Sequence, residues 1–311
     1  MPGLPLQLME DAALVSRFTG HKEPVYALAS GLRKGQFFSA GGDGWVVEWD
    51  LEKPTEGRLL ARMSGTVYAL CLIPEFNLLA VSVNKDGFHF LDLDSGKVAF
   101  SIAGPESNWF RMEKTADGRL LAMGSSGRLA ILDLNERAVK FLQAGSGDLR
   151  ALTIFQDNSG FAFGGSDSFI RLFDQDAQTR SLISETHSNT IFGLAAYPDG
   201  QHFVSCGRDA RLILHERQDS GEWKVKTAVP AHLFGIHDVR LHPEKPILAS
   251  CSMDKTVKIW EAIDLRLLRV LDRARHGGHG HSVNQLCWLA ESDLLLSCSD
   301  DRSVSAWNIY R

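Results

Sequence analysis

Short apolar runs separated by turn residues recur along the whole chain. The first stretch shows the pattern in five successive segments: Val25–Ala29, Gln36–Ser39, the turn Gly41–Gly44, Trp45–Trp49 and Arg58–Met63. Runs of about five residues, rich in β-branched and aromatic side chains, are typical of strands, because helices need longer periodic segments. The pattern therefore predicts an all-β chain built from short strands.

Two phrases recur at a fixed place in this pattern and define a repeat. A histidine precedes the first run in Gly20-His21, Thr186-His187, Ala231-His232 and Gly278-His279. A second phrase closes the third run at intervals of 41–47 residues: Trp49-Asp50, Leu91-Asp92, Leu132-Asp133, Phe173-Asp174, His215-Glu216, Trp260-Glu261 and Trp307-Asn308. Seven repeats of four runs predict a seven-bladed β-propeller with four antiparallel strands per blade.

The repeats use nearly all of the 311 residues, so we expect one domain. The last repeat has no fourth run after Asn308, and the apolar segment Leu14–Phe18 fits the missing outer strand. Pairing there would close the ring and remove an open sheet edge. The expected division is a tail (1–12), the outer strand of blade 7 (13–19), blade 1 (20–63), blade 2 (64–103), blade 3 (104–143), blade 4 (144–186), blade 5 (187–229), blade 6 (230–272) and blade 7 (273–311).

Composition narrows the function classes. The chain is 44% hydrophobic and 23% charged, with a net charge of −5 and a pI of about 6.1. These values argue against a general binder of nucleic acids or of anionic membranes. No apolar run approaches the length of about 18 residues that a membrane-spanning helix needs, and the first residues lack a secretion-signal pattern. We expect an intracellular, cytoplasmic protein, with the nucleus as the alternative compartment.

The repeat and its two phrases resemble those of the WD-repeat (WD40) family over the full length of the chain. The resemblance is strong in repeats one, six and seven, intermediate in repeat five and weak in repeats two to four. It implies a non-catalytic scaffold that binds a protein or peptide partner, commonly as part of a multiprotein complex.

Four residues recur with identical spacing in the three strong repeats. Serine, aspartate and tryptophan follow the histidine by 18, 22 and 28 residues in the sets His21, Ser39, Asp43, Trp49; His232, Ser250, Asp254, Trp260; and His279, Ser297, Asp301, Trp307. The resemblance implies that each set forms a buried hydrogen-bonded tetrad, which is stable only when every member is satisfied. A Ser/His/Asp set could also suggest a hydrolase triad. Its repetition, the tryptophan and the lack of a Gly-x-Ser-x-Gly segment favour the structural role.

The other repeats keep fewer members of this set. Repeat five has His187, Ser205 and Asp209 but carries His215 in place of tryptophan, and repeat four keeps only Asp167. Repeats two and three have neither the histidine nor the aspartate. We expect blades 2 to 4 to depend on packing and to be the looser side of the ring.

Cysteine and histidine usage predicts no metal site and no cofactor. The five cysteines are odd in number and form no Cys-x-x-Cys pair, and three of them follow a serine at the same place in successive repeats. We expect small apolar side chains packed between sheets. The loop Arg273–His281 has three histidines that could bind a metal, but His279 belongs to a tetrad, so we expect a solvated loop.

Under the family resemblance, the partner site lies on the narrower face of the ring, where the first strand of each blade begins. The residues 17 positions before each turn aspartate or its equivalent are Tyr26, Tyr68, Trp109, Arg150, Phe192, His237 and Asn284. Four of the seven are large aromatics, a residue type common in binding hot spots. We expect them at the mouth of the central channel; the alternative is that they are simply core. The turn residues Asn84, Arg208, Met253 and Asp300 should complete the rim, and Arg150 with Arg208 could clamp an anion.

Two other functions remain open at this point. A small-ligand site or a reader of modified lysine or arginine could use Tyr26, Tyr68 and Trp109 as an aromatic cage around a cation. A propeller enzyme would need converging carboxylates in the channel mouth. The predicted ring of entry residues contains no carboxylate.

Overall fold

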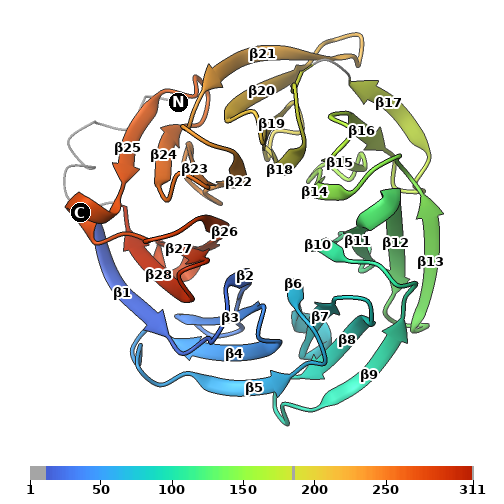
Figure 1. Ribbon diagram of the computed structural model, residues 1–311. Helices are drawn as coiled ribbons and strands as arrows, with labels where there is room; N and C mark the ends of the chain where they lie inside the picture. The colour runs from blue at the N-terminus through green and yellow to red at the C-terminus, as the bar shows by residue number, and fades with distance from the viewer. Residues whose placement is uncertain (1–11, 184–185, 310–311) are drawn as a thin grey trace.

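Seven four-stranded antiparallel sheets stand in a ring around a central channel (Figure 1). The computed structural model describes residues 12–183 and 186–309, whose strands are numbered β1 to β28 along the chain. The predicted fold class, an all-β seven-bladed propeller, is confirmed. Most of the expected N-terminal tail, residues 1–11, lies outside the described residues.

Each blade runs from an inner strand at the channel to an outer strand at the rim. The innermost strands are β2 (Val25–Ser30), β6 (Val67–Ile73), β10 (Trp109–Lys114), β14 (Leu149–Ile154), β18 (Ile191–Ala196), β22 (Ile236–Leu241) and β26 (Val283–Leu289). Next to them lie β3 (Gln36–Gly41), β7 (Leu78–Val83), β11 (Leu120–Gly124), β15 (Phe161–Gly165), β19 (His202–Gly207), β23 (Ile247–Ser252) and β27 (Leu294–Ser299). The third strands are β4 (Trp45–Asp50), β8 (Gly87–Asp92), β12 (Arg128–Asp133), β16 (Ile170–Phe173), β20 (Arg211–Arg217), β24 (Val257–Glu261) and β28 (Ser303–Asn308). The outermost strands are β5 (Arg58–Arg62), β9 (Val98–Ala103), β13 (Ala138–Gln143), β17 (Thr179–Ile183), β21 (Trp223–Pro230), β25 (Leu267–Leu271) and β1 (Ala13–Thr19).

The two ends of the chain share blade 7, as predicted. Strand β1 pairs antiparallel with β28 from Ala13 opposite Asn308 to Thr19 opposite Ser303, and Figure 1 shows blue β1 beside red β28. Phe18 of β1 is fully buried and meets the Phe37 ring edge-on at 4.8 Å. The closing strand therefore pairs its backbone and also buries an aromatic side chain against blade 1.

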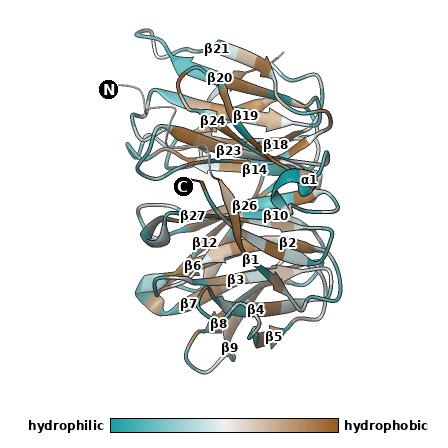
Figure 2. Ribbon diagram, turned by 90° about the vertical axis from the view of Figure 1, so that its left-hand side faces the viewer, coloured by the Kyte–Doolittle hydropathy of each residue, from teal (hydrophilic) through white to brown (hydrophobic). Residues whose placement is uncertain are grey.

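The hydrophobic core lies between neighbouring sheets. Figure 2, a view of the disc from the side, shows hydrophobic residues mainly in the strands and hydrophilic residues mainly in the loops of both faces. The three cysteines that follow serines, Cys206, Cys251 and Cys298, are fully buried in these clusters. All five cysteines are free thiols, in agreement with a role as small apolar side chains.

Helical segments are few and short. The four-residue helix α1 (Arg273–His276) is capped by Asp272, whose side chain accepts a hydrogen bond from the Arg275 amide. Single 3-10 turns occur at η2 (Pro74–Phe76), η3 (Ser125–Gly127) and η4 (Ala290–Ser292). Among the described residues, no helix has the length and hydrophobicity needed to cross a bilayer.

Candidate functional site

A β-bulge at the start of every innermost strand places one side chain at the mouth of the channel. In blade 1, Val25 pairs with Gly41 and Ala27 with Ala40, so Tyr26 between them is left out of the ladder. The same irregularity occurs in the other six blades. Bulges re-aim a side chain relative to the sheet, and the seven bulged residues are Tyr26, Tyr68, Phe110, Arg150, Phe192, His237 and Asn284. Each is half-buried, and together with Arg111 and Gln285 they line an open cavity of about 260 Å³.

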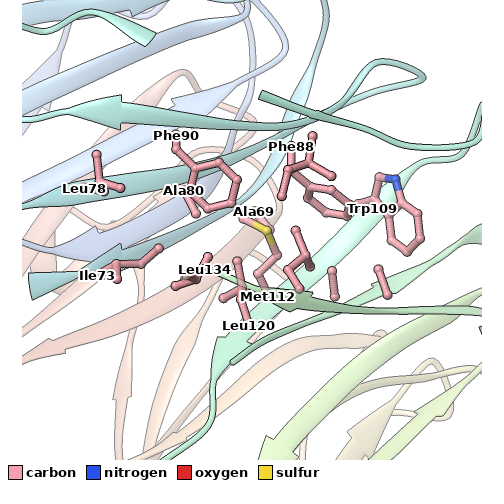
Figure 3. Packing of buried hydrophobic residues seen from close by; sticks show 14 residues of the cluster. Ala69, Ile73, Leu78, Ala80, Phe88, Phe90, Trp109, Met112, Leu120 and Leu134 are labelled. Atoms are coloured by element: carbon pink, nitrogen blue, oxygen red, sulfur yellow. The ribbon is translucent and has the colours of Figure 1, made fainter. Parts of the chain in front are cut away.

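The prediction for blade 3 was wrong by one residue. Trp109 does not reach the channel mouth: it is 1% exposed and its neighbour Phe110 occupies the bulge. Figure 3 shows the Trp109 indole beside the Phe88 ring, in the cluster between blades 2 and 3. The reason is the shorter hairpin of this blade, where Trp109 pairs with Gly124 only 15 positions later. The equivalent pairs of the other blades, such as Val25 with Gly41, are 16 positions apart.

A signal for this shift was present in the sequence. In the other blades an aliphatic residue precedes the bulged position and is buried, as Val25 and Leu149 are. The fixed offset of 17 residues put the polar Asn108 at that place in blade 3. If the assignment is moved by one residue, Trp109 takes the buried apolar position and Phe110 takes the bulged position at the mouth.

The aromatic side chains of the mouth form an arc along its rim. The ring centroids of Tyr26 and Tyr68 are 5.3 Å apart at 34°, and those of Tyr68 and Phe110 are 5.6 Å apart at 57°. The Arg150 guanidinium continues the row at 4.0 Å from the Phe110 ring. Neighbouring rings therefore pack on one another along the rim, and such contacts hold each ring in a fixed orientation.

The other bulged residues interact with the backbone and with nearby polar groups. His237 packs edge-on against Phe192 at 5.6 Å, and its Nδ1 lies 3.0 Å from the carbonyl oxygen of Val283. Burial, and to a lesser extent the positive Arg150, lowers the pKa of His237 below its ordinary value. Asn284 donates a hydrogen bond to the predicted rim residue Asp300 at 2.8 Å. These contacts fix the remainder of the ring of side chains.

Charged groups of both signs lie at the mouth: Asp148 pairs with Arg150, and Asp300 accepts a hydrogen bond from Asn284. The nine residues that line the cavity include two arginines and no carboxylate. Arg150 is partly exposed and donates to Asp148 at 3.0 Å, whereas the exposed Arg208 forms no ion pair with another described residue. The structure therefore places Arg150 at the mouth, as predicted, and Arg208 on the turn between β19 and β20, where no ion pair with the described part of the chain forms.

The floor of the mouth is a buried charge network that spans the channel. Arg111 of blade 3 donates to Asp238 of blade 6 at 3.1 Å, and Asp238 also accepts a hydrogen bond from the Leu286 amide. Arg240 contacts both Asp238 and Glu113, at 3.2 and 3.3 Å. Buried charges persist only when they are paired, and this arrangement neutralises Arg111 on the side away from the mouth.

An exposed apolar patch lies next to the mouth on blade 6. Leu233 is 83% exposed, Phe234 61% and Met253 44%. Met253 was among the predicted partner residues; Leu233 and Phe234 were missed because they precede the strand and lie outside the repeating offsets. Leu233 and Phe234 lie in the loop from β21 to β22, which joins an outermost strand to an innermost strand, as the segment with α1 does between β25 and β26.

The predicted tetrads are assembled in blades 1, 6 and 7. In blade 1 the Nδ1 of His21 is 3.0 Å from Asp43, its Nε2 is 2.8 Å from the Ser39 hydroxyl, and Trp49 Nε1 is 2.8 Å from the same hydroxyl. Blades 6 and 7 repeat this geometry within 0.1 Å. The indole can only donate, so the hydroxyl accepts from it and donates to Nε2, and the imidazole donates to the carboxylate.

These tetrads are structural elements of the blades. Ser39, Ser250 and Ser297 are fully buried, so no substrate can reach their hydroxyls. Burial lowers the pKa of His232 despite its aspartate. Burial alone would raise the pKa of Asp254, but the hydrogen bonds from His232, Thr256 and the Leu233 amide outweigh it and hold that pKa below the usual range.

Blade 5 contains a variant of the same network. His187 contacts Asp209 at 2.9 Å and Ser205 at 2.8 Å, as in a tetrad. His215 takes the place of the tryptophan, with its Nε2 2.8 Å from the Ser205 hydroxyl and its ring stacked on Phe203 at 4.3 Å. Burial lowers the pKa of His215 to about 3. The described residues contain no group of three or more His, Cys, Asp or Glu side chains placed to hold a metal.

Comparison with known proteins identifies the repeat. The family model "WD domain, G-beta repeat" matches residues 12–50, 178–216, 223–261 and 269–308, just over half of the chain. These segments carry the histidine, serine and aspartate of blades 1, 5, 6 and 7. The β-propeller domain of Doa1 superposes with a TM-score of 0.83 at 20% identity and 96% coverage of both chains, which supports the fold.

The relatives that match almost the whole of this chain are distant in sequence. Transducin beta-like protein 3 of Rattus norvegicus is 21% identical over 96% of this chain and 41% of its own length. Actin-interacting protein 1 of Drosophila melanogaster is 19% identical over 93% of this chain and 46% of its own length. The chain thus spans less than half of these relatives. With its repeat matches and its seven four-stranded blades, the chain belongs to the WD-repeat family of β-propellers.

Proposed function

We propose that this protein is a non-catalytic interaction scaffold that binds a protein or peptide segment on the channel-mouth face, as part of a multiprotein complex. Propellers of this family serve in general as platforms for other proteins. The observation that carries the proposal is the arc of half-buried aromatic side chains, Tyr26, Tyr68 and Phe110, that continues into Arg150.

The arc has the physical properties of a binding hot spot. Tyrosine and arginine are enriched among the residues that dominate interface energies. Their packing on one another restricts their rotamers before a partner arrives, which lowers the entropy cost of association. A partner side chain that covers these rings would remove apolar surface from water without requiring the mouth to rearrange.

The alternative functions fit the mouth less well. A cage for a methylated lysine or arginine would have the rings facing a cation, whereas here they pack along the rim and two arginines line the same cavity. The Arg150 guanidinium already lies against the Phe110 ring, and its positive charge opposes the binding of a second cation there. An enzyme would need carboxylates or metal ligands among the lining residues, and the lining residues include no carboxylate.

The test is affinity capture of partners from cell extract with wild type and with the double variant Tyr68→Ala/Phe110→Ala. Both rings are half-buried at the mouth, so we expect the variant to fold and to lose the partners that wild type retains. The matched control is Val98→Ala/Val225→Ala, which removes two exposed apolar side chains from the outer strands. Retention of every partner by the mouth variant, or equal loss in the control, would contradict the proposal.

A further inference from the structure

The apolar patch beside the mouth is specific to blade 6. In the tetrad blades, the two residues after the histidine begin the loop that leads to the innermost strand. In blades 1, 5 and 7 these pairs are Lys22 and Glu23, Ser188 and Asn189, and Gly280 and His281. In blade 6 the pair is Leu233 and Phe234, and both side chains are exposed. Since the other blades fold with polar residues or glycine here, folding does not require the apolar pair.

The backbone under the patch is held in place by the tetrad and by the adjacent turn. The Leu233 amide donates to Asp254 at 3.1 Å, and the Met253 amide donates to the Gly235 carbonyl at 3.0 Å. The Ser252 hydroxyl donates to the Phe234 carbonyl at 3.0 Å. Leu233, Phe234 and Met253 are therefore exposed on a fixed support, and an exposed apolar cluster of this kind marks an interaction surface.

The mouth, with its arginines, lies a short distance further along the chain. His237, a bulged residue of the mouth, follows Phe234 by three positions, so a peptide of a few residues, at about 3.3 Å each, can contact both features. Arg150 is partly exposed but pairs with Asp148 at 3.0 Å, whereas the exposed Arg208, whose backbone lies beside Gly235, forms no ion pair with another described residue. The chain as a whole carries a net charge of −5, so the exposed Arg208 next to the patch stands out against an acidic molecule.

We propose that the channel-mouth face recognises an acidic–apolar peptide segment of a partner protein. An aspartate or glutamate side chain enters the mouth beside Arg150, and neighbouring apolar side chains pack on Leu233, Phe234 and Met253. This inference rests on the proposed function and specifies its partner. A nucleic acid is the less favoured occupant, because the overall negative charge of the chain repels a polyanion and the apolar patch has no charged group to bind phosphate.

A phage-displayed library of random 12-residue peptides selected on the wild-type protein tests the inference. We expect the enriched peptides to combine Asp or Glu with Leu, Ile, Phe or Met, and to lose binding in Phe110→Ala. In synthetic form, their affinity should fall on the order of tenfold in Arg150→Gln, because a charge-assisted hydrogen bond is lost. It should fall similarly in Phe234→Ser, and should weaken with added salt.

Matched controls separate this inference from the proposed function. Arg33→Gln removes an exposed arginine from the hairpins of the opposite face, and Val225→Ser removes an exposed apolar side chain from the outer strand β21. Both variants should bind the peptides with unchanged affinity. Enriched peptides that depend on Phe110 but lack acidic residues, or that bind Arg150→Gln normally, would overturn the inference and leave the proposed function standing. Peptides that ignore Phe110, or no enrichment at all, would count against both, and a preference for single-stranded oligonucleotides over peptides would overturn the inference.

Discussion

Blades 1, 5, 6 and 7 and blades 2, 3 and 4 reach the same four-stranded geometry with different interiors. In the first group a histidine, a serine and an aspartate form a buried polar chain. In the second group aromatic packing takes its place: Phe90 stacks on Phe100 at 4.3 Å, and Phe163 meets Phe173 edge-on at 4.8 Å. The family model matches only the first group. The blade is thus defined by its strand order and burial, and the polar chain is one of several ways to fill it.

Blade 4 shows how a lost member is replaced. Glycine stands at Gly145, where the tetrad blades have histidine, and the guanidinium of Arg171 lies close to that position. Arg171 makes two hydrogen bonds to Asp167, at 3.1 and 2.7 Å. The retained aspartate is therefore satisfied by an arginine from its own blade, so that no unpaired carboxylate remains near the core.

The largest loss of stability is expected when an aromatic side chain is removed from the packed interior of blade 3. Trp109→Ala should lower the free energy of unfolding by ~3–5 kcal/mol, because the indole is fully buried against Phe88. Chemical denaturation followed by circular dichroism measures this cost. Phe110→Ala, one residue away at the half-buried mouth, is the control and should be much milder. Equal costs for both variants would show that the two neighbours share one environment, contrary to the structure.

A somewhat smaller effect should follow from breaking a tetrad. Asp254→Ala leaves the His232 Nδ1–H and the Leu233 amide without their acceptor, which should cost on the order of 1–3 kcal/mol. Differential scanning calorimetry measures the loss, and Asp264→Ala, at an exposed turn of the same blade, should change little. A melting profile of Asp254→Ala that matches the parent would show that the tetrad does not stabilise the fold.

His215 in blade 5 should make the free energy of unfolding depend on pH. His215 has a folded pKa of about 3, far below the ordinary value of about 6.5. As the pH falls below about 6.5, the unfolded chain binds a proton that the folded chain refuses, so the free energy of unfolding decreases with falling pH. Each pH unit between about 6.5 and 5 should cost on the order of 1 kcal/mol from this group. His215→Phe keeps the stacking on Phe203 and should flatten the slope measured by urea titration; an unchanged slope would assign it to other groups.

The sequence predicts that blades 2 to 4 open more readily than the other blades. Native-state hydrogen exchange should show faster opening for the amides of β7, β11 and β15 than for those of β3, β23 and β27 if the polar chain restrains opening more than aromatic packing does. The expected difference is the smallest in this series, because both interiors are fully buried. Equal protection in all blades would mean that aromatic packing replaces the tetrad without loss.

The difference between the two groups also explains what could be predicted from the sequence. The tetrads could be located from residue spacing alone, because His21, Ser39 and Asp43 must keep fixed sequence separations for their side chains to form hydrogen bonds. The seven blades and the closing strand followed from the period and the run near Phe18. Trp109 was misplaced because packing imposes no such offset, and one residue fewer in a hairpin shifts every position that precedes it. Leu233 and Phe234 were missed because these exposed apolar residues do not recur at the same position in the other repeats.

The most direct test of the binding face is hydroxyl-radical footprinting of the protein, free and bound to a captured partner, with mass spectrometric readout. We expect binding to protect the mouth side chains Tyr26, Tyr68 and Phe110, together with Phe234 and Met253 of the apolar patch. Val98 and Val225 of the outer strands should be labelled equally in both states. Protection confined to those outer strands, with the mouth labelled as in the free protein, would contradict partner binding at the channel mouth.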